Sequence, residues 1–168
     1  YSYRVAGTVG LMMAKILNVT SSNSLKSAID LGIAMQLTNI SRDIVEDSKN
    51  KRFYIKQDFE TIKETLATAD LFYESSFSSI KDIPLSLRFS ILVARRVYRQ
   101  IGRNIMKKQT IQNYNQSGKI FVSNSGKIYQ TILSIYDLLK LSLIKKQYHL
   151  RDKEHELISE EISLNERF

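Results

Sequence analysis

The stretch LGIAMQLTNISRDIVED, residues 31 to 47, decides the fold. Apolar residues recur in it every three or four positions, which is the spacing of one face of an α-helix. They are Ile33, Leu37, Ile40 and Ile44. No proline interrupts the pattern. The stretch therefore predicts a long helix, from about Leu25 to Asp47, that buries this face in a core.

The remainder of the chain is also predicted to be helical. One proline and six glycines in 168 residues leave few breaks. Apolar spacing predicts further helices over residues 3–17, 58–77, 85–108 and 123–149. Asp58 is the expected N-cap of the helix that it begins, and residues 110–118 are expected to form a polar loop. The predicted fold class is all-α.

The domain organisation follows from length and charge. The chain is long enough for one core, and we expect residues 1–150 to form part of one domain. Residues 151–168 are mostly charged and are expected to form a surface tail. His149 and His155 lie in this charged sequence and are predicted to be exposed to solvent.

The composition narrows the class of protein. Without cysteine the chain has no disulfide, no thiolate metal site and no cysteine nucleophile, and we expect it in the reducing cytoplasm. No run of about 18 uncharged apolar residues predicts a membrane span. The net charge of +8 suits nucleic acid, an anionic membrane surface or a polyanionic small substrate, and composition alone does not choose among them.

A polar stripe runs along the helix predicted at residues 25–47, displaced by roughly 90° from the apolar stripe. It consists of Gln36, Asn39, Asp43 and Asp47. Because the last three are spaced by four residues, they project in one row, with the two aspartates about 6 Å apart along the axis. Mg²⁺ binds carboxylate and carbonyl oxygens and completes its shell with substrate phosphates. The row is a candidate metal site.

The basic loop after this helix would suit a metal–diphosphate site. Lys49, Lys51 and Arg52 follow the row directly, and cations of this kind bind phosphate groups. A solvated helix end with scattered charges would contain the same residues. Spacing alone leaves both interpretations open.

Two segments carry a resemblance to a known family. Residues 1–13, YSYRVAGTVGLMM, and residues 36–47, QLTNISRDIVED, are similar to the two signatures of squalene and phytoene synthases. The segments DLGIAM at residues 30–35 and KRFYI at residues 51–55 resemble bacterial phytoene synthases in particular. Weaker similarity continues to about Lys127. The resemblance covers roughly the second half of the family's domain, so we expect the chain to be a C-terminal fragment.

The resemblance implies a fold and a set of site residues. The fold is the all-α isoprenoid synthase helical bundle, of which this chain would form only the C-terminal part. Asn39, Asp43 and Asp47 would bind Mg²⁺, or Mn²⁺ in its place. Tyr1, Asp43 and Asp47 would take part in catalysis. The residues that would border the substrate or its diphosphate are Gln36, Arg52, Tyr54, Tyr98 and Lys119.

The reaction that the resemblance implies joins two geranylgeranyl diphosphates head to head to phytoene, in carotenoid biosynthesis, without NADPH. One alternative is the synthesis of squalene or dehydrosqualene from farnesyl diphosphate. Another is a non-catalytic relative that acts as an assembly factor. A fragment with half of the metal site is expected to be inactive alone.

The expected partner is a prenyl diphosphate. Because substrate and product are lipids, peripheral contact with the inner face of the membrane is also expected. No nucleic acid is expected, since a solvated helix face explains the basic cluster in the helix predicted at residues 85–108. The cluster consists of Arg95, Arg96, Arg99 and Arg103. Ala6, Gly10 and Ala14, spaced by four residues, would let another helix approach closely and, in the family, would leave room for the prenyl chain.

Overall fold

The computed structural model describes residues 1–145 and residue 155, and it confirms an all-α fold for this part of the chain. The elements are, in chain order, η1 (Tyr3–Gly7), α1 (Thr8–Ile16), α2 (Ser22–Arg42), α3 (Ile44–Lys49), α4 (Phe59–Phe77), η2 (Ser78–Asp82), α5 (Leu85–Met106), α6 (Ile111–Gln116) and α7 (Asn124–Leu143). Element η1 is a π-helical turn and η2 is a 3₁₀ turn. None of the described helices is long and apolar enough to cross a membrane.

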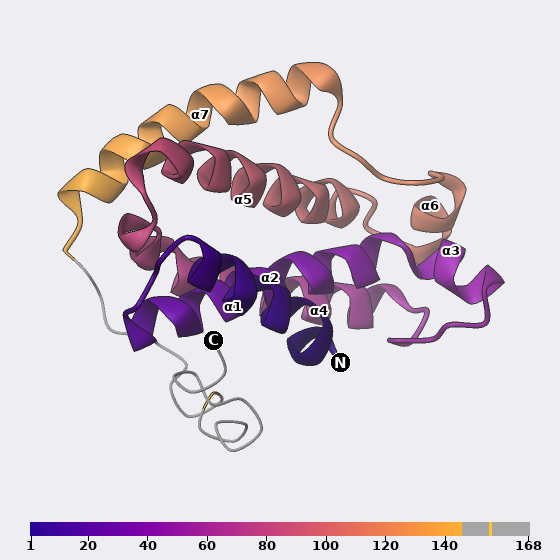
Figure 1. Cartoon of the computed structure of the whole chain (residues 1–168). Coiled ribbons are helices and arrows are strands. Elements are labelled where there is room, and N and C mark those ends of the chain that lie inside the picture. The colour runs from indigo at the N-terminus through magenta and orange to yellow at the C-terminus, as the bar shows by residue number, and fades with distance from the viewer. Residues whose placement is uncertain (146–154, 156–168) are drawn as a thin grey trace.

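The helices are arranged around α2 and α5. Helix α2 packs against α1 and α4, while α5 packs against α7 and α2. In Figure 1, α5 lies between α7 on one side and the group of α1, α2 and α4 on the other. The short helices α3 and α6 lie together at one end of the bundle. This arrangement places the end of α2 beside the segment that leads into α7.

The core consists of three apolar clusters. The first is built mainly from α1, α2 and α4, around Leu25, Ile29 and Tyr73. The second joins α3, α4, α5 and α6, and the third joins α4, η2, α5 and α7. Three residues of the stripe predicted from the sequence, Ile33, Ile40 and Ile44, are buried in these clusters or beside them. The orientation of this helix was therefore predicted correctly.

Small residues allow η1 and α1 to lie directly on α2. A Cβ at Gly10 would stand 2.2 Å from the backbone oxygen of Ala28, and one at Gly32 would stand 2.2 Å from the backbone oxygen of Ala6. Neither position has room for any side chain. The close approach that was expected for Ala6, Gly10 and Ala14 is confirmed.

The helix predicted at residues 25–47 is divided at Asp43, where the backbone φ and ψ angles are −102° and 11°. The hydroxyl of Tyr114 donates to the backbone oxygens of Ser41 and Arg42, at 2.9 and 2.8 Å, immediately before the break. A partner 72 residues away in the sequence thus binds the last turn of α2. No local pattern could have predicted it.

The remaining boundaries were mostly predicted. Asp58 caps α4 by accepting from the backbone N–H of Thr61 at 2.7 Å, as expected. Residues 110–118 are not a plain loop, because Thr110 accepts from the backbone N–H of Asn113 and starts the six-residue helix α6. Helix α7 ends at Leu143, and the rest of the helix predicted to residue 149 lies outside the described residues. The same holds for residues 151–168, except His155.

Two predictions of solvent exposure were wrong. Arg95 is only 5% exposed, donates twice to the backbone oxygen of Tyr73 and lies 4.8 Å above the ring of Phe77. The neighbouring Arg96 and Arg99 form ion pairs with acidic residues of α7 and α4. Arg95, Arg96 and Arg99 therefore hold helices together, and of the four arginines in the predicted solvated face only Arg103 is exposed. His155 is also buried.

Candidate functional site

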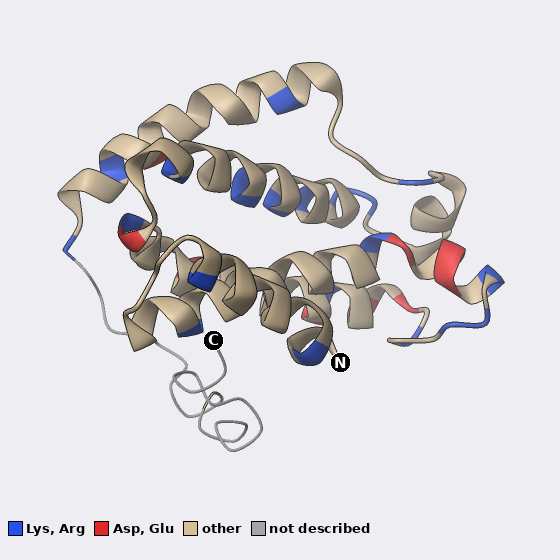
Figure 2. Ribbon diagram, in the orientation of Figure 1, with Lys and Arg blue, Asp and Glu red and all other residues tan. Residues whose placement is uncertain are grey.

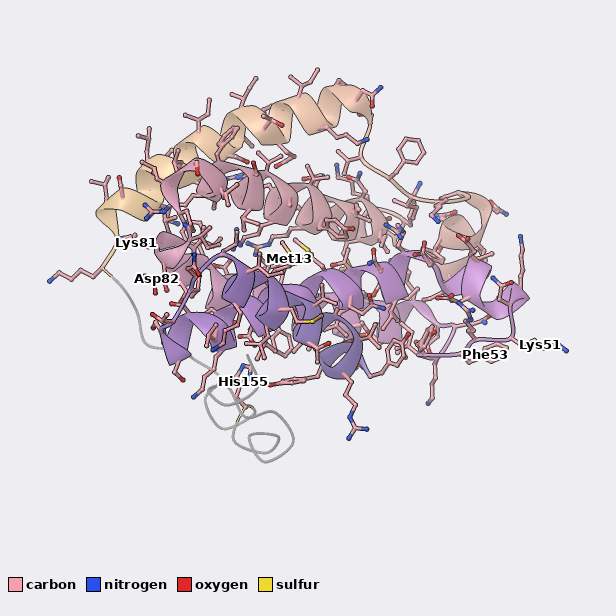
Figure 3. All side chains as sticks on the ribbon, viewed as in Figure 1. Met13, Lys51, Phe53, Lys81, Asp82 and His155 are labelled. Atoms are coloured by element: carbon pink, nitrogen blue, oxygen red, sulfur yellow. The ribbon has the colours of Figure 1, made fainter. Side chains whose placement is uncertain are left out.

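An apolar cavity of about 470 Å³ lies between α1, α2, η2 and α5. Aliphatic side chains and small residues form most of its lining, and Met13 of α1 points toward α5 across it (Figure 3). Among the residues that the structure describes, Gln36 and Asn39, one turn apart on α2, contribute the only amide side chains of this lining. Ala6, Gly10 and Ala14 also line the cavity, so these small residues serve both the helix contact and the open space.

Asn39 carries an unsatisfied group at the edge of this cavity. Its Oδ1 atom is buried and has no hydrogen-bond partner among the residues that the structure describes. A buried carbonyl oxygen without a partner costs free energy of folding, on the order of 1–3 kcal/mol. Such an atom is commonly explained by a ligand, an ion or an ordered water.

Asp43 is surrounded by positive charge. Arg42 donates to its two carboxylate oxygens, from Nε at 2.7 Å and from Nη2 at 2.5 Å. Lys119 Nζ lies 3.6 Å from Asp43 Oδ1 and 2.8 Å from Glu46 Oε2. These contacts raise the pKa of Arg42, chiefly through its hydrogen bond to Asp43, and raise the pKa of Lys119, chiefly through its hydrogen bond to Glu46. The group is a compact mixture of two cations and two anions.

Asp47 faces the loop that follows α3. It lines a small hollow together with Arg52 and Tyr54, and its backbone oxygen accepts from the N–H of Arg52 at 2.9 Å. Lys51 and Phe53, in the same loop, extend away from the bundle (Figure 3). The loop therefore directs alternate side chains toward Asp47 and toward solvent.

Tyr1 and Tyr54 come together although 53 residues separate them. The hydroxyl of Tyr1 donates to that of Tyr54 at 3.2 Å, and their ring centroids are 4.6 Å apart. This hydrogen bond is the main cause of a raised pKa of Tyr54. Tyr1 is exposed, so the pair forms an open edge of the molecule rather than part of the cavity.

The predicted site residues therefore fall into neighbouring groups. Asn39 faces the cavity, Asp43 faces Lys119, and Asp47 faces Arg52. Backbone hydrogen bonds from Asp43 to Asn39 and from Asp47 to Asp43, at 2.9 and 2.7 Å, keep the row in helical register through the break. Tyr98 is half-buried in the core and is not part of the cavity lining.

Sequence reasoning missed the roles of three residues here. Arg42 and Glu46 were not part of the predicted row, yet both are joined to the group around Asp43 and Lys119. The adjacency of Arg42 to Asp43 was the available signal for the first. Tyr114, whose pKa burial raises to about 12, gave no signal because its partners lie on α2.

Comparison of the sequence with those of known proteins shows the family of this chain. The family model described as squalene/phytoene synthase matches residues 1–60, which include Tyr1, Tyr54 and the whole polar row. The 15-cis-phytoene synthase of Paracoccus sp. is 36% identical over 146 residues, and the match covers 76% of this chain and 47% of that protein. The chain belongs to the squalene/phytoene synthase family.

Two further relatives match this chain over a similar share of their own length. The 15-cis-phytoene synthase of Enterobacter agglomerans is 36% identical over 128 residues, and the match covers 64% of this chain and 43% of that protein. The enzyme of the same name from Synechococcus elongatus is 29% identical over 164 residues, and the match covers 89% of this chain and 49% of that protein. The chain thus spans just under half the length of these relatives.

The resemblance to squalene and phytoene synthases implies Mg²⁺, and the donor chemistry of the row is suited to such an ion. One amide oxygen and two carboxylates are hard oxygen ligands, and the orphaned Oδ1 of Asn39 fits a bound ligand. Asp43 is already neutralised by Arg42, so it would have to exchange partners to bind a metal. Within the described residues, no three His, Cys, Asp or Glu side chains are grouped as a metal site.

Proposed function

We propose that the complete synthase condenses two geranylgeranyl diphosphates head to head to phytoene, and that this chain supplies one wall of the prenyl pocket and part of the diphosphate site. The observation that carries the proposal is the apolar cavity whose lining includes the amides of Gln36 and Asn39, on the side of α2 that leads to Asp43. A prenyl chain requires such an apolar space, and its diphosphate requires polar groups at one end. The printed names of the relatives, phytoene synthases, support the same substrate.

In this proposal, the side chains of the cavity and those at the end of α2 would have different roles. The aliphatic walls would hold the prenyl chain and exclude water from carbocations that form during the reaction. Arg52 and Lys119 would hold the diphosphate by charge-assisted hydrogen bonds. Asn39, Asp43 and Asp47 would hold Mg²⁺ once Asp43 has left its ion pair with Arg42, and the bound metal would supply positive charge that stabilises the departing diphosphate.

The pair of Tyr1 and Tyr54 would lie beside this diphosphate. Tyr54 shares its loop with Arg52, and Tyr1 is fixed against Tyr54 by the hydrogen bond between their hydroxyls. A phenol at this place can donate a hydrogen bond to a phosphate oxygen or accept a proton. A tyrosine hydroxyl is protonated near neutral pH, and the hydrogen bond with Tyr1 raises the pKa of Tyr54 further, which favours the first role.

The test is product formation by the protein expressed from its complete gene. The protein is incubated with geranylgeranyl diphosphate and Mg²⁺, and the extracted lipids are separated by chromatography beside an Asp43→Ala/Asp47→Ala variant. Phytoene from the native protein alone is expected. Product only from farnesyl diphosphate would replace the proposed substrate, and no product from either would indicate a non-catalytic relative.

Metal binding has a readout that does not depend on turnover. Mn²⁺ titrated into the native protein should be bound with diphosphate present, as followed by electron paramagnetic resonance. The Asp43→Ala/Asp47→Ala variant should bind it at least about tenfold more weakly, while Glu60→Ala, an exposed acidic residue of α4, should bind as the native protein does. Equal binding by all three proteins would contradict the proposed ligands.

A further inference from the structure

A second pocket, of about 180 Å³, lies between α4, α5 and α7 and shares no lining residue with the apolar cavity. Helix α5, along which basic residues can be seen in Figure 2, supplies four of its cations. The charged residues of the lining are Arg95, Arg96, Arg99, Arg103 and Lys140, with Glu74 and Asp137. Because five cations face two carboxylates, the pocket is strongly positive. We call it the basic pocket.

Both carboxylates of the basic pocket are already paired. Arg96 donates to the two oxygens of Asp137, at 2.5 and 2.6 Å. Arg99 donates from Nη1 to Glu74 at 2.5 Å, and from Nε to Asp70, which lies outside the lining, at 2.8 Å. These pairs occupy two of the five cations. The other three have no carboxylate of their own among the residues that the structure describes.

The three remaining cations lie at different depths. Arg95 is 5% exposed, and its Nε and Nη2 atoms donate to the backbone oxygen of Tyr73, while Glu74 Oε1 is 3.9 Å from Nη2. Burial lowers the pKa of Arg95 to about 10, because the charged form loses its water. Arg103 and Lys140 are exposed and form no ion pair within the described part of the chain. The pocket therefore combines a buried positive charge with two open ones.

The spacing of these arginines adds repulsion between like charges. Arg95, Arg99 and Arg103 follow one another at every fourth residue, so they form one row on α5. Like charges at this spacing destabilise a helix, and a buried charge without an opposite charge costs further stability. Negative charge placed in the pocket would offset both costs.

The size and the donors of the basic pocket indicate which anion it takes. Pockets for drug-sized organic ligands are about 300–1,000 Å³, so this one suits a small ion. Guanidinium groups bind phosphate oxygens by charge-assisted hydrogen bonds, and lysine adds a point charge. We propose that the basic pocket binds a small phosphate-type anion, inorganic phosphate or diphosphate, between Arg95, Arg103 and Lys140. Since Lys140 comes from α7 and the arginines from α5, the bound anion would join these helices. The proposal does not depend on Mg²⁺ or on the proposed reaction.

Calorimetric titration tests the basic pocket in the protein expressed from its complete gene. Inorganic diphosphate, and separately phosphate, is added at constant ionic strength with EDTA present, so that no divalent metal contributes. The variant Arg103→Ser/Lys140→Ser removes the two exposed cations of the pocket and keeps the buried Arg95. The matched control, Lys107→Ser/Lys127→Ser, removes two exposed cations outside the lining, at the end of α5 and in α7.

A third variant, Arg52→Ser/Lys119→Ser, removes cations of the proposed reaction site. The native protein, the control and this third variant are expected to bind diphosphate alike, and Arg103→Ser/Lys140→Ser should bind it at least about tenfold more weakly. Diphosphate should also raise the melting temperature of every protein except Arg103→Ser/Lys140→Ser, because a ligand of the folded state stabilises it.

Three results would overturn the proposal. They are no binding of either anion by the native protein, equal binding by Arg103→Ser/Lys140→Ser, and an equal loss in the matched control, which would show a general effect of charge. Binding that only Arg52→Ser/Lys119→Ser loses would place the anion at the proposed reaction site and would also overturn it. Failure to form phytoene, with these binding results unchanged, would contradict the proposed function alone.

Discussion

Nε2 of His155 lies 3.0 Å from Oδ1 of Asp30, a carboxylate of α2 with no exposed surface. The other ring nitrogen of His155 lies 3.0 Å from the hydroxyl of Tyr3, and the hydroxyl of Ser75 donates to the second oxygen of Asp30. Burial and the charge of Asp30 raise the pKa of Tyr3 to about 12. His155 thus ties a distant part of the sequence to η1 and α2 (Figure 3).

We expect His155→Ala to lower the free energy of unfolding by about 1–3 kcal/mol, because it removes a partner of a fully buried carboxylate. A double-mutant cycle with Asp30→Asn separates this pair from general packing. In the Asp30→Asn background, His155→Ala should lower the free energy of unfolding by less, as measured by urea denaturation. Equal costs in the two backgrounds would show that His155 is held by packing and not by Asp30.

The pair of His155 and Asp30 shows why a run of charged residues does not predict that a residue within it is exposed. Residues 151–155 read RDKEH, and a pattern analysis of such a segment predicts a solvated histidine. The partner that removes His155 from solvent lies 125 residues earlier, inside the apolar pattern of α2. Other charged residues of this fold also cannot be placed from their local sequence. Basic residues occur both along α5 and near the end of α2 (Figure 2). The acidic partners of Arg96 and Arg99 in α5 come from other helices, whereas Arg42 at the end of α2 pairs with the adjacent Asp43.

Gly32→Ala should destabilise the chain by at least about 2 kcal/mol, since the new Cβ would stand 2.2 Å from the backbone oxygen of Ala6. Gly102→Ala is the matched control, because its Cβ would meet only the flexible end of Leu66, at 3.2 Å. Alanine is the better helix former by about 1 kcal/mol, so the control should be neutral or stabilising. Thermal denaturation of the two variants compares them. Similar losses of melting temperature would mean that η1 moves away from α2 at little cost in free energy.

Local chemistry predicted the helices well where the deciding residues are close in sequence. The stripe through Ile33, the cap at Asp58 and the small residues around Gly10 could all be inferred from spacing and residue type. The break at Asp43 and the burial of Arg95 could not, because each depends on a residue brought in by the fold. For the candidate site, the sequence named the row but not the distribution of its members over separate hollows.

The N-cap of α4 should make stability depend on pH. The backbone N–H of Thr61, and then its hydroxyl, lower the pKa of Asp58 in the folded chain. The contribution is therefore present above the unfolded pKa, about 3.9, and is lost as the pH falls through the folded pKa. Asp58→Ala should lower the melting temperature at neutral pH, and its difference from the native chain should shrink in acid.

The matched variant for this prediction is Asp58→Asn, which keeps a capping oxygen without the charge. Its melting temperature should lie between those of the native chain and Asp58→Ala at neutral pH. Calorimetry over a series of pH values measures all three. A constant difference between the native chain and Asp58→Ala down to strongly acidic pH would show that the carboxylate charge contributes nothing to the cap.

Asn39 and Thr38 are neighbours on α2, and their substitution should affect the stability of the chain in opposite ways. The buried Oδ1 of Asn39 has no described partner, so Asn39→Ala should leave the stability of the chain unchanged or raise it. Thr38 donates to the backbone oxygen of Ala34 at 2.9 Å and is 3.1 Å from the hydroxyl of Tyr73. Thr38→Val should therefore cost about 1 kcal/mol.

The effects of Asn39→Ala and Thr38→Val on phytoene formation should be the reverse of their effects on stability. If the oxygen of Asn39 is reserved for a ligand, the protein from the complete gene should lose most phytoene formation on Asn39→Ala and keep it on Thr38→Val. Urea denaturation and product chromatography on the same preparations measure both properties. A large loss of stability in Asn39→Ala would indicate an internal partner for Oδ1. Full activity of Asn39→Ala would remove Asn39 from the proposed site. A side chain that contributes to neither stability nor activity would be part of the cavity wall alone.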